Sequence, residues 1–411
     1  MPPHDPAHGR VAFDATEKLV LFPGQHAPKY ILHAMQKLKI GVAGLGRAFA
    51  VMSGAFSDPR VELVAAADPR REALEKFRKD YGGRAYGSVE ELCDDPSVEV
   101  IYIATPHHFH APQACLAASK GKHVLVEKPM ALTMDDCRAM IDAARKAGVQ
   151  LIVGHSHSFD APILQTRKLI GSNAFGRVRM ITALDFTDFL FRPRRPEELA
   201  TEKGGGVFYN QAMHQVDIVR LLAGGEVRSL RAFAGKWDQA RPTEGAYSCL
   251  LRFDNSVFAT LVYSGYAHFD SDEFMGWIGE MGQKKDPAAY SVARRTLVGD
   301  EMALKAARNY GGSEFKETQP SAHQHFGLII ASCEKADLRA LPTGVMIYGD
   351  SEQRLEPLPT PKVPRQEVID ELYGAVAEGR GPLHSGEWAM ATLEVCLALL
   401  RSARQSKEIL L

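Results

Sequence analysis

The sequence predicts an α/β protein in which a doubly wound parallel sheet is followed by an α+β domain with a mixed, largely antiparallel, open-faced sheet. Three observations lead to this expectation. Short apolar strands alternate with helical patterns over residues 39–154, and a glycine turn directly follows the first strand. Beyond residue 155, strand-like runs follow one another with only turns between them. Alternation is typical of parallel βαβ units, whereas consecutive strands are typical of antiparallel pairing.

The segment KIGVAGLGRAF, residues 39–49, contains a strand, a glycine turn and the start of a helix in immediate succession. Gly44 and Gly46 stand at the first two positions of a G-x-G-x-x-G pattern, whereas Phe49 stands at the third. The first glycine permits the tight turn, and the second lets the backbone approach a pyrophosphate at the helix N-terminus. A bulky third residue should alter the packing of helix on strand. We expect a dinucleotide in this Rossmann domain to be bound by Gly44, Leu45, Gly46 and Arg47.

A helix is expected over 47–56 and a buried strand over 61–67, which ends at Asp68. Asp68 lies 22 residues after Gly46 (68 − 46), close to the usual spacing of about 20 for the carboxylate that accepts hydrogen bonds from the adenosine ribose. The position favours NAD as the cofactor. NADP is not excluded, because Arg70 or Arg71 is able to hold a 2′-phosphate. A solvated aspartate at a helix start is the structural alternative.

The alternation continues with helices expected over 71–81, 89–94, 112–120 and 133–146, and strands over 98–104, 123–126 and 149–154. Ligands bind just beyond the carboxyl ends of parallel strands. We therefore expect the cofactor to contact the residues that follow two of these strands, which are Thr105, Pro106, His110, Glu127 and Lys128. His107, His108 and His110 also resemble a metal cluster, but no carboxylate or cysteine completes the spacing, so a cofactor-lining loop is favoured and no metal site is assigned.

Beyond residue 155, strands are expected over 178–183, 230–234, 247–253 and 256–263, with a helix over 211–222. The irregular segments 184–204 and 264–315 are expected to be substrate loops. An apolar stripe predicts helix over 365–402, packed back on the first domain. Because single cores stop growing at roughly 250 to 300 residues, several parts are expected. These are an N-terminal extension over 1–37, the NAD-binding Rossmann domain over 38–157, a substrate and oligomerisation domain over 158–364, and C-terminal helices over 365–411.

The composition excludes several classes of partner. With 49 basic and 50 acidic residues the net charge is near zero, so nothing favours nucleic acid or an anionic membrane. The six cysteines lack C-x-x-C spacing, which argues against a zinc site and predicts reduced thiols. No secretory signal or membrane-spanning run is recognisable, so a cytoplasmic protein is expected. Its expected partners are a small-molecule substrate and copies of itself, because open sheet faces often become subunit interfaces in dimers or tetramers.

Asn210 and His214 follow a glycine-rich lead-in and are expected on one face of a helical turn, four residues apart. A lysine after a sheet strand and a histidine from a neighbouring domain form a reasonable acid/base pair for alcohol oxidation. One holds or deprotonates the hydroxyl while the hydride of its carbon leaves to nicotinamide. We therefore expect Lys128 and His214 to be catalytic. The structural alternatives are a salt-bridge lysine and a buried core histidine.

The motifs GVAGLG, ATPHHFH and EKP, with the GGG…H-x-x-D block ending at Asp217, together resemble the Gfo/Idh/MocA oxidoreductase family from about Lys39 to the C-terminus. The resemblance implies that Lys128 and His214 line the catalytic centre beside the nicotinamide. The residue four before that histidine is commonly aspartate in the family, whereas here it is Asn210. An amide cannot take a proton, so Asn210 is expected to orient the substrate by hydrogen bonding.

Within the family, AGLGRAF, FRPRRPEEL, QAMHQVDIVR and other stretches are similar to those of phthalate cis-dihydrodiol dehydrogenases. The similarity implies oxidation of a cis-dihydrodiol carboxylate, after which the enone tautomerises to a catechol. Such an anion needs cations, which Arg192, Arg194 and Arg195 supply unless they form a solvated surface loop. His155 and His157 are expected to face the same cavity. A sugar or inositol dehydrogenase and a non-catalytic nucleotide-sensing regulator are the competing functions.

Overall fold

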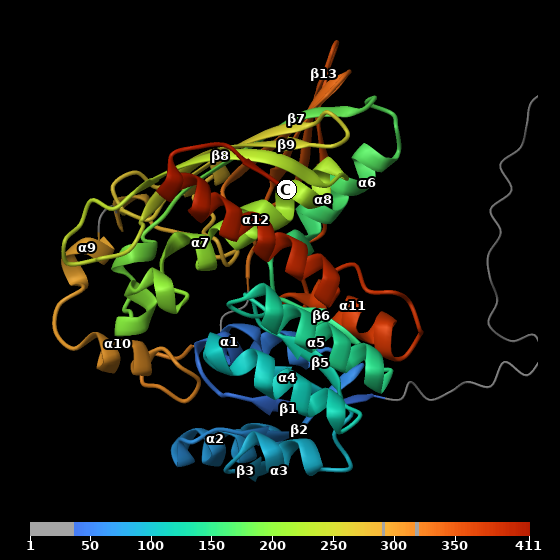
Figure 1. Ribbon diagram of the computed structural model, residues 1–411, viewed down its shortest axis with the longest axis vertical. Coiled ribbons are helices and arrows are strands. Elements are labelled where there is room, and N and C mark those ends of the chain that lie inside the picture. The colour runs from blue at the N-terminus through green and yellow to red at the C-terminus, as the bar shows by residue number, and fades with distance from the viewer. Residues whose placement is uncertain (1–36, 290–291, 317–319) are drawn as a thin grey trace, which may run out of the picture. The chain divides into compact units, whose positions relative to one another are not determined.

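Figure 1 shows a computed structural model of the chain, which describes residues 37–289, 292–316 and 320–411. The chain divides after Gln36, and the unit Lys37–Leu411 contains both sheets. The extension expected over 1–37 lies outside the described residues, apart from Lys37. Within the described ranges, every helix is too short or too polar to cross a membrane.

The first half of the unit contains a six-stranded parallel sheet in the order β3-β2-β1-β4-β5-β6. The strands are β1 Leu38–Ala43, β2 Val61–Ala67, β3 Arg84–Tyr86, β4 Val100–Ile103, β5 His123–Val126 and β6 Leu151–Val153. The helices are α1 Arg47–Met52, α2 Arg71–Tyr81, α3 Val89–Asp94, α4 His110–Ser119 and α5 Met134–Ala147. The chain reverses its direction of winding between β1 and β4, and ligands bind at such a switch point. The predicted doubly wound sheet is confirmed.

Local signals set several helix ends in this half. Thr133 caps α5, because its Oγ1 accepts the Asp136 N–H at 3.1 Å, and Gly148 ends the helix with φ 67°. The helix expected over 47–56 is shorter than predicted: α1 ends at Met52 and a 3₁₀ turn, Ser53–Ser57, follows. The three-residue strand β3 was not expected.

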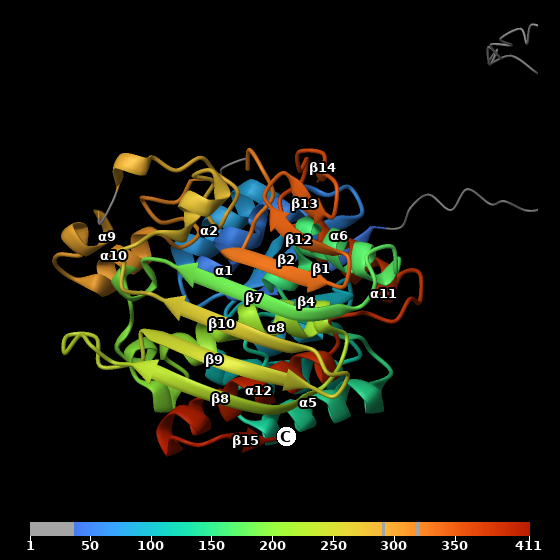
Figure 2. The ribbon, with the colours of Figure 1, turned by 90° about the horizontal axis from the view of Figure 1, so that it is seen from above.

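A nine-stranded sheet forms the second half, in the order β14-β13-β12-β11-β7-β10-β9-β8-β15, and Figure 2 shows its strands side by side. All neighbours are antiparallel except β7 and β10, which are parallel, so the predicted mixed sheet is confirmed. The strands are β7 Val178–Phe186, β8 Val227–Gly235, β9 Ala246–Phe253, β10 Phe258–Ser264, β11 Leu328–Cys333, β12 Ala336–Leu341, β13 Gly344–Gly349, β14 Gln353–Pro357 and β15 Ile409–Leu410. The strands from β11 to β15 were not predicted.

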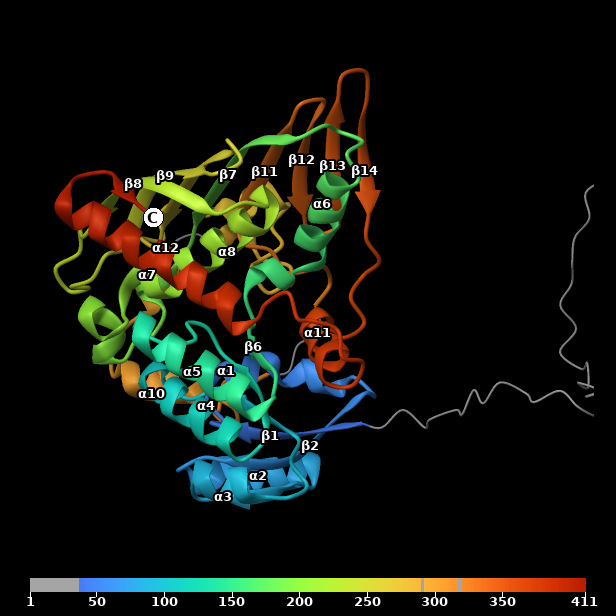
Figure 3. The same ribbon diagram turned by 45° about the vertical axis from the view of Figure 1, so that its right-hand side comes forward.

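The helices of this half are α6 Ala161–Gly171, α7 Gly206–Asn210, α8 Ala212–Ala223, α9 Val292–Thr296, α10 Glu301–Ala307, α11 Gln366–Val376 and α12 Gly386–Gln405. The C-terminal helices expected over 365–411 are thus α11 and α12. Helix α11 packs on the first sheet's core through Val368, Ile369 and Leu372. Helix α12 contacts α5 as well as α8 and β8, and Figures 1 and 3 show it running between the two sheets. The internal domain boundaries near residues 157 and 364 stay a prediction.

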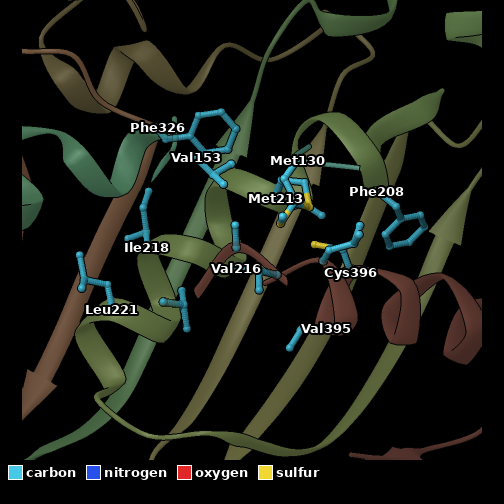
Figure 4. Close-up of a cluster of buried hydrophobic side chains, with 14 of the residues drawn as sticks. Met130, Val153, Phe208, Met213, Val216, Ile218, Leu221, Phe326, Val395 and Cys396 are labelled. Carbon is cyan, nitrogen blue, oxygen red and sulfur yellow. The ribbon is translucent and has the colours of Figure 1, made fainter. Parts of the chain in front are cut away.

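One continuous cluster of buried side chains joins the two halves. Figure 4 shows Met130 and Val153, from the first half, against Met213 and Val216 of α8 and Cys396 of α12. Each fully buried apolar side chain of this size stabilises the fold by roughly 1.5–3 kcal/mol. The loop after β5 is thus anchored at Met130, two residues beyond Lys128, and the position of the lysine backbone is fixed by the core.

Candidate active site

Two adjoining cavities lie where the halves meet. The glycine-loop cavity, about 490 Å³, is lined by Gly46, Thr105 and Glu127 among others. The sheet cavity, about 570 Å³, is lined by Asp185 of β7 and by residues of the segment 270–285. The residues that line both cavities mark their junction and are Arg47, Val51, Lys128, Arg194, Asn210, His214, Glu280, Lys305 and Arg365.

The glycine turn fits a dinucleotide. Gly44 has φ 93°, and a Cβ there would lie 2.9 Å from the Ala104 carbonyl oxygen, so only glycine suits this position. A Cβ on Gly46 would meet nothing within 4 Å, because this backbone borders open cavity. Arg47 lines the same cavity, whereas Leu45 is fully buried. The turn therefore offers backbone and one cation to a pyrophosphate.

Phe49, at the third glycine position, is fully buried in an aromatic cluster. Its ring centroid lies 4.9 Å from that of Tyr310 and 6.2 Å from that of Phe56, and it also contacts Phe77 and Tyr81. Tyr310 belongs to the segment after α10, and its hydroxyl donates to Asp80 at 2.6 Å. Phe49 thus changes the packing as expected: its aromatic cluster connects the segment after α10 to the first sheet.

Asp68 lies at the end of β2 as predicted, but its carboxylate is already engaged. Oδ2 accepts the Leu45 N–H at 2.7 Å, and Oδ1 accepts the Arg70 N–H at 2.8 Å and its Nε–H at 3.0 Å. The Arg70 guanidinium also donates to the Leu45 carbonyl at 2.6 Å. Arg71 is solvent-exposed and pairs with Glu75. A ribose hydroxyl therefore reaches Asp68 in competition with Arg70.

The loop after β4 lines the glycine-loop cavity with Thr105, Pro106, His107 and His110, whereas His108 is exposed. The ring nitrogens of His110 lie 2.8 Å from the Thr105 carbonyl and 2.9 Å from the Pro129 carbonyl. His110 thereby ties this loop to the loop that carries Lys128. In the described ranges the three neighbouring histidines form no convergent group of metal ligands.

Glu127 also lines the glycine-loop cavity and is held in place by the sheet. The Tyr102 hydroxyl donates to Glu127 Oε1 at 2.7 Å. Burial raises the pKa of the Glu127 carboxyl, and the Tyr102 hydrogen bond and the nearby Arg365 charge oppose the rise.

Lys128 reaches the junction from the end of β5. Its Nζ donates to the Asn210 carbonyl at 2.9 Å, which aims the amine between the halves. Burial lowers the pKa of Lys128 to about 8, although the carboxylates of Glu127 and Glu280 oppose the change. At pH 7 roughly one tenth of the amine is therefore unprotonated and able to accept a proton.

Asn210 and His214 line the same junction but do not share a helix. Asn210 ends α7, Gln211 lies between the two helices and Ala212 begins α8, so the expectation of one continuous helical turn is wrong. The Asn210 amide donates to the Gly206 carbonyl at 2.8 Å and to the Gly204 carbonyl at 3.3 Å. Both N–H groups are thus directed to the backbone, and Oδ1 is the atom left to orient a hydroxyl.

His214 is held as a neutral ring with a defined tautomer. The His157 backbone N–H points at its Nδ1 at 3.4 Å, so Nδ1 accepts and Nε2 carries the proton. Burial and the charges of Lys128 and His157 lower its pKa well below the ordinary value. His214 therefore donates a hydrogen bond from Nε2 and does not compete with Lys128 as a base.

A buried ion-paired group lies behind His214. Nδ1 of His157 lies 2.7 Å from Asp160 Oδ2, and Nε2 of His155 lies 3.2 Å from Asp160 Oδ1. Burial opposes a charge on His157, but the carboxylates of Asp160 and Glu280 outweigh it and raise its pKa to about 9. Burial lowers the pKa of His155 to about 3. His155 and His157 thus line the glycine-loop cavity as a neutral and a charged ring.

The three predicted arginines differ in their pairing. Arg192 is neutralised by Asp188 at 2.7 Å and Glu280 at 2.9 Å. Arg195 lies beside Glu197 and Glu198 and lines only the glycine-loop cavity. Arg194 lines both cavities, and its guanidinium donates to the Phe189 carbonyl at 2.7 Å and covers the Phe189 ring at 3.8 Å. Of the three, Arg194 is the one that offers an uncompensated positive charge at the junction.

Two family models match the chain: "Oxidoreductase family, NAD-binding Rossmann fold" over residues 38–155, and "GFO/IDH/MocA C-terminal domain" over residues 163–283. The chain belongs to the Gfo/Idh/MocA oxidoreductase family. It is 48% identical to the 1-carboxy-3-chloro-3,4-dihydroxycyclohexa-1,5-diene dehydrogenase of Comamonas testosteroni, over 89% of this chain and 95% of that relative. This oxidoreductase carries an NAD-binding Rossmann domain.

Two further relatives extend the comparison. The levoglucosan dehydrogenase of Pseudarthrobacter phenanthrenivorans is 30% identical over 51% of this chain and 57% of its own length. A crystal structure from Bordetella bronchiseptica, of a protein assigned as a dehydrogenase, superposes with a TM-score of 0.87 at 39% identity and covers 92% of this oxidoreductase and 100% of its own chain.

Four residues of the junction were not predicted: Val51, Glu280, Lys305 and Arg365. Glu280 ends the stretch YSGYAHFDSDEFMGWIGE, residues 263–280, which is also similar to phthalate cis-dihydrodiol dehydrogenases, so its sequence context was a usable signal. Arg365 stands before α11, at a site that no local motif marks. Its Nε donates to Gln324 Oε1 at 3.2 Å, and its guanidinium lines both cavities.

Proposed function

We propose that the chain oxidises a ring-carboxylated cis-dihydrodiol to a catechol with NAD⁺. The observation that carries this proposal is the position of Lys128 Nζ, at the junction of the two cavities, with a pKa lowered to about 8 by burial. The substrate class is supported by the similarity to a dehydrogenase whose name describes a carboxylated dihydroxycyclohexadiene. Arg194, uncompensated at the same junction, supports an anionic substrate.

The reaction removes a proton from a hydroxyl and a hydride from the carbon that bears it. NAD⁺, held along the glycine-loop cavity by the turn at Gly44 and Gly46, supplies the hydride acceptor. Lys128, as the free amine, accepts the hydroxyl proton, and its hydrogen bond to the Asn210 carbonyl keeps the nitrogen aimed at the substrate. His214 Nε2–H donates to the same oxygen, and Asn210 Oδ1 accepts from the neighbouring hydroxyl.

After the hydride transfer, the ring becomes a catechol without a further reagent. The oxidised carbinol becomes a ketone within a ring that already has two double bonds. The remaining carbinol C–H proton then moves to the ketone oxygen, and the ring becomes aromatic. The gain of aromaticity makes the oxidation favourable even though the first step is reversible.

The direct test is incubation of the purified chain with NAD⁺ and a carboxylated cis-dihydrodiol, such as that of phthalate. NADH absorbance and a catechol should appear together. The competing function is a sugar or inositol dehydrogenase, which the similarity to a levoglucosan dehydrogenase favours. This function predicts faster turnover of polyols than of anionic diols. Absence of turnover on both classes, with NAD⁺ still bound, would leave the nucleotide-sensing regulator.

We also propose a homo-oligomer, in the cytoplasm as the sequence suggests. The outer face of the nine-stranded sheet exposes large apolar side chains, with Phe233, Leu250 and Phe258 between 49% and 62% exposed. These residues alternate with buried ones along β8, β9 and β10, so they point to one face. Exposed apolar groups of this size favour an interface. Sedimentation of the wild type and of Leu250→Asp tests this: the wild type should be larger, and equal monomers would refute it.

A further inference from the structure

Three guanidinium groups face the junction without an ion pair to a carboxylate of the described chain: Arg47, Arg194 and Arg365. Their hydrogen-bond acceptors are neutral. Arg47 donates to the Arg308 carbonyl at 3.3 Å, Arg194 to the Phe189 carbonyl at 2.7 Å, and Arg365 to Gln324 Oε1 at 3.2 Å. A further Arg365 nitrogen lies 3.7 Å from Met281 Sδ. A partly buried cation with neutral partners alone is costly, and an anionic ligand would remove that cost.

Two neighbouring cations, Arg192 of the sheet cavity and Lys305 of the junction, are already neutralised. Arg192 lies between Asp188 and Glu280, and Lys305 donates to Glu198 at 2.7 Å. Glu280, the carboxylate of the junction, is itself shared between Arg192 and His157. Apart from the Lys128 amine, which donates to the Asn210 carbonyl, the uncompensated positive charge at the junction therefore belongs to the three arginines.

The three arginines approach from different walls. Arg47 belongs to the glycine turn and is placed for the cofactor phosphates. Arg194 follows the 3₁₀ turn Phe189–Phe191 of the second half, and Arg365 comes from the segment before α11. Arg194 and Arg365 are thus the pair left for a ligand beside the cofactor, from two segments that are far apart in the sequence.

The backbone of Arg365 is itself unusual. Its φ is 55°, in the left-handed region that non-glycine residues seldom adopt. Such a conformation costs of order 1–3 kcal/mol and persists where the surroundings hold it. Here α11 begins at the next residue and is anchored in the core by Val368 and Leu372. A strained residue whose side chain lines both cavities is the pattern expected of a ligand contact.

We propose that Arg365, together with Arg194, binds the carboxylate on the substrate ring. This inference rests on the proposed function and names the group that distinguishes its substrate from a neutral diol. A guanidinium presents two parallel N–H groups to a planar carboxylate, so it fixes the orientation of the ring as well as its charge. With the carboxylate held between the two halves, the diol edge of the ring lies at Lys128 and His214.

The kinetic test compares two diols that differ in the carboxylate: the 3,4-cis-dihydrodiol of benzoate, whose carboxylate lies on a ring carbon outside the diol, and the cis-dihydrodiol of benzene. Arg365→Gln should raise the KM for the carboxylated diol by about tenfold to a hundredfold, the loss typical of a charged hydrogen bond. It should leave the KM for the benzene diol and for NAD⁺ unchanged. Arg365→Lys keeps the charge but loses the two parallel N–H groups, so its KM for the carboxylated diol should lie between those of the wild type and Arg365→Gln. Arg138→Gln, an exposed arginine of α5, should change nothing.

Two kinetic outcomes would overturn the inference. An equal loss on both diols would show that Arg365 acts only through the fold. A raised KM for NAD⁺ with an unchanged substrate KM would show that it holds the cofactor instead.

A binding measurement separates this inference from the proposed function. Benzoate is an unreactive ring carboxylate, and its binding to the protein with NAD⁺ is measurable by calorimetry. Arg365→Gln and Arg194→Gln should each weaken benzoate binding by at least about tenfold, whereas Arg138→Gln should not. Unchanged benzoate binding in Arg365→Gln overturns the inference even if diols are oxidised. Benzoate binding that depends on Arg365, without turnover of any diol, supports the inference and overturns the proposed function alone.

Discussion

The two cavities meet at Lys128, yet their walls are built in different ways. One wall of the glycine-loop cavity is made by short stretches at the ends of β1, β4 and β5, where backbone geometry and neighbouring residues set the shape. The sheet cavity is made by segments remote in sequence and held by charge, as Arg192 is held by Glu280. The wall of the glycine-loop cavity, called here the first wall, therefore recognises a common cofactor through local motifs. The wall of the sheet cavity, the second wall, determines substrate specificity through long-range ion pairs.

Lys128→Ala acts where the two walls meet and has the largest expected effect. Loss of a general base typically lowers turnover by about 10²- to 10⁴-fold. The affinity for NAD⁺ should change little, because the glycine turn and not the lysine approaches the phosphates. Turnover is measured by NADH absorbance and NAD⁺ affinity by calorimetry, with the exposed Lys146→Ala as the control. Unchanged turnover would remove Lys128 from the mechanism, and a parallel loss of NAD⁺ binding would make it a cofactor contact.

The pH dependence of kcat/KM also tests whether Lys128 is the base. The base must be unprotonated, so kcat/KM should rise about tenfold per pH unit below the pKa of Lys128, near 8, and level off above it. Lys128→Arg stays charged throughout, and its residual activity should lack this rise. A plateau extending down to pH 6 in the wild type would contradict the assignment.

Asp160→Asn tests the charged network that supports both walls. The pKa of His157 is raised to about 9 from its ordinary 6.5, so its charge stabilises the fold fully below pH 6.5 and this stabilisation is lost as pH rises through 9. The shift corresponds to about 3 kcal/mol, and removal of one partner of a buried pair costs about 3–5 kcal/mol. The variant should be less stable to urea at pH 6.5, with a weaker decline toward pH 9. Exposed Asp135→Asn should match the wild type, and an unaltered decline in Asp160→Asn would refute the pairing.

Asn210→Asp restores the residue that the family commonly carries, yet we expect a loss. The amide now donates to the carbonyls of Gly204 and Gly206, and a carboxylate would lose both hydrogen bonds and face two oxygens. The cost should be about 1–3 kcal/mol of stability, seen as a lower Tm, with slower turnover. The exposed Asn173→Asp serves as control. Faster turnover at unchanged Tm would mean that a carboxylate at this position works as a base here as well.

The sequence predicted most where the signal is local. The ends of β2, β5, α2 and α3 agree with the pattern, because apolar runs and caps lie within each element. The glycine turn and Lys128 were found for the same reason.

Long-range features were not predictable in this way. The break between Asn210 and His214 has no proline or glycine to mark it. Arg192 was expected to bind substrate, but Glu280, 88 residues away, neutralises it. Arg365 enters the site from beyond the second sheet. Such pairing depends on the fold as a whole, so it becomes visible only when the segments are brought together.

Arg70→Ala gives the smallest expected effect and tests how far the first wall depends on charge. Arg70 now occupies Asp68 and the Leu45 carbonyl. Its removal frees the carboxylate for the ribose hydroxyls of NAD and takes away the cation that offsets the 2′-phosphate of NADP. The preference for NAD over NADP, measured as the ratio of kcat/KM, should rise about tenfold. Arg71→Ala should leave this ratio unchanged, because Arg71 points into solvent and pairs with Glu75 at the surface. If Arg71→Ala changed the NAD/NADP ratio and Arg70→Ala did not, the exposed arginine would determine the choice of cofactor. The glycine-loop cavity would then also depend on a charge outside its local motif.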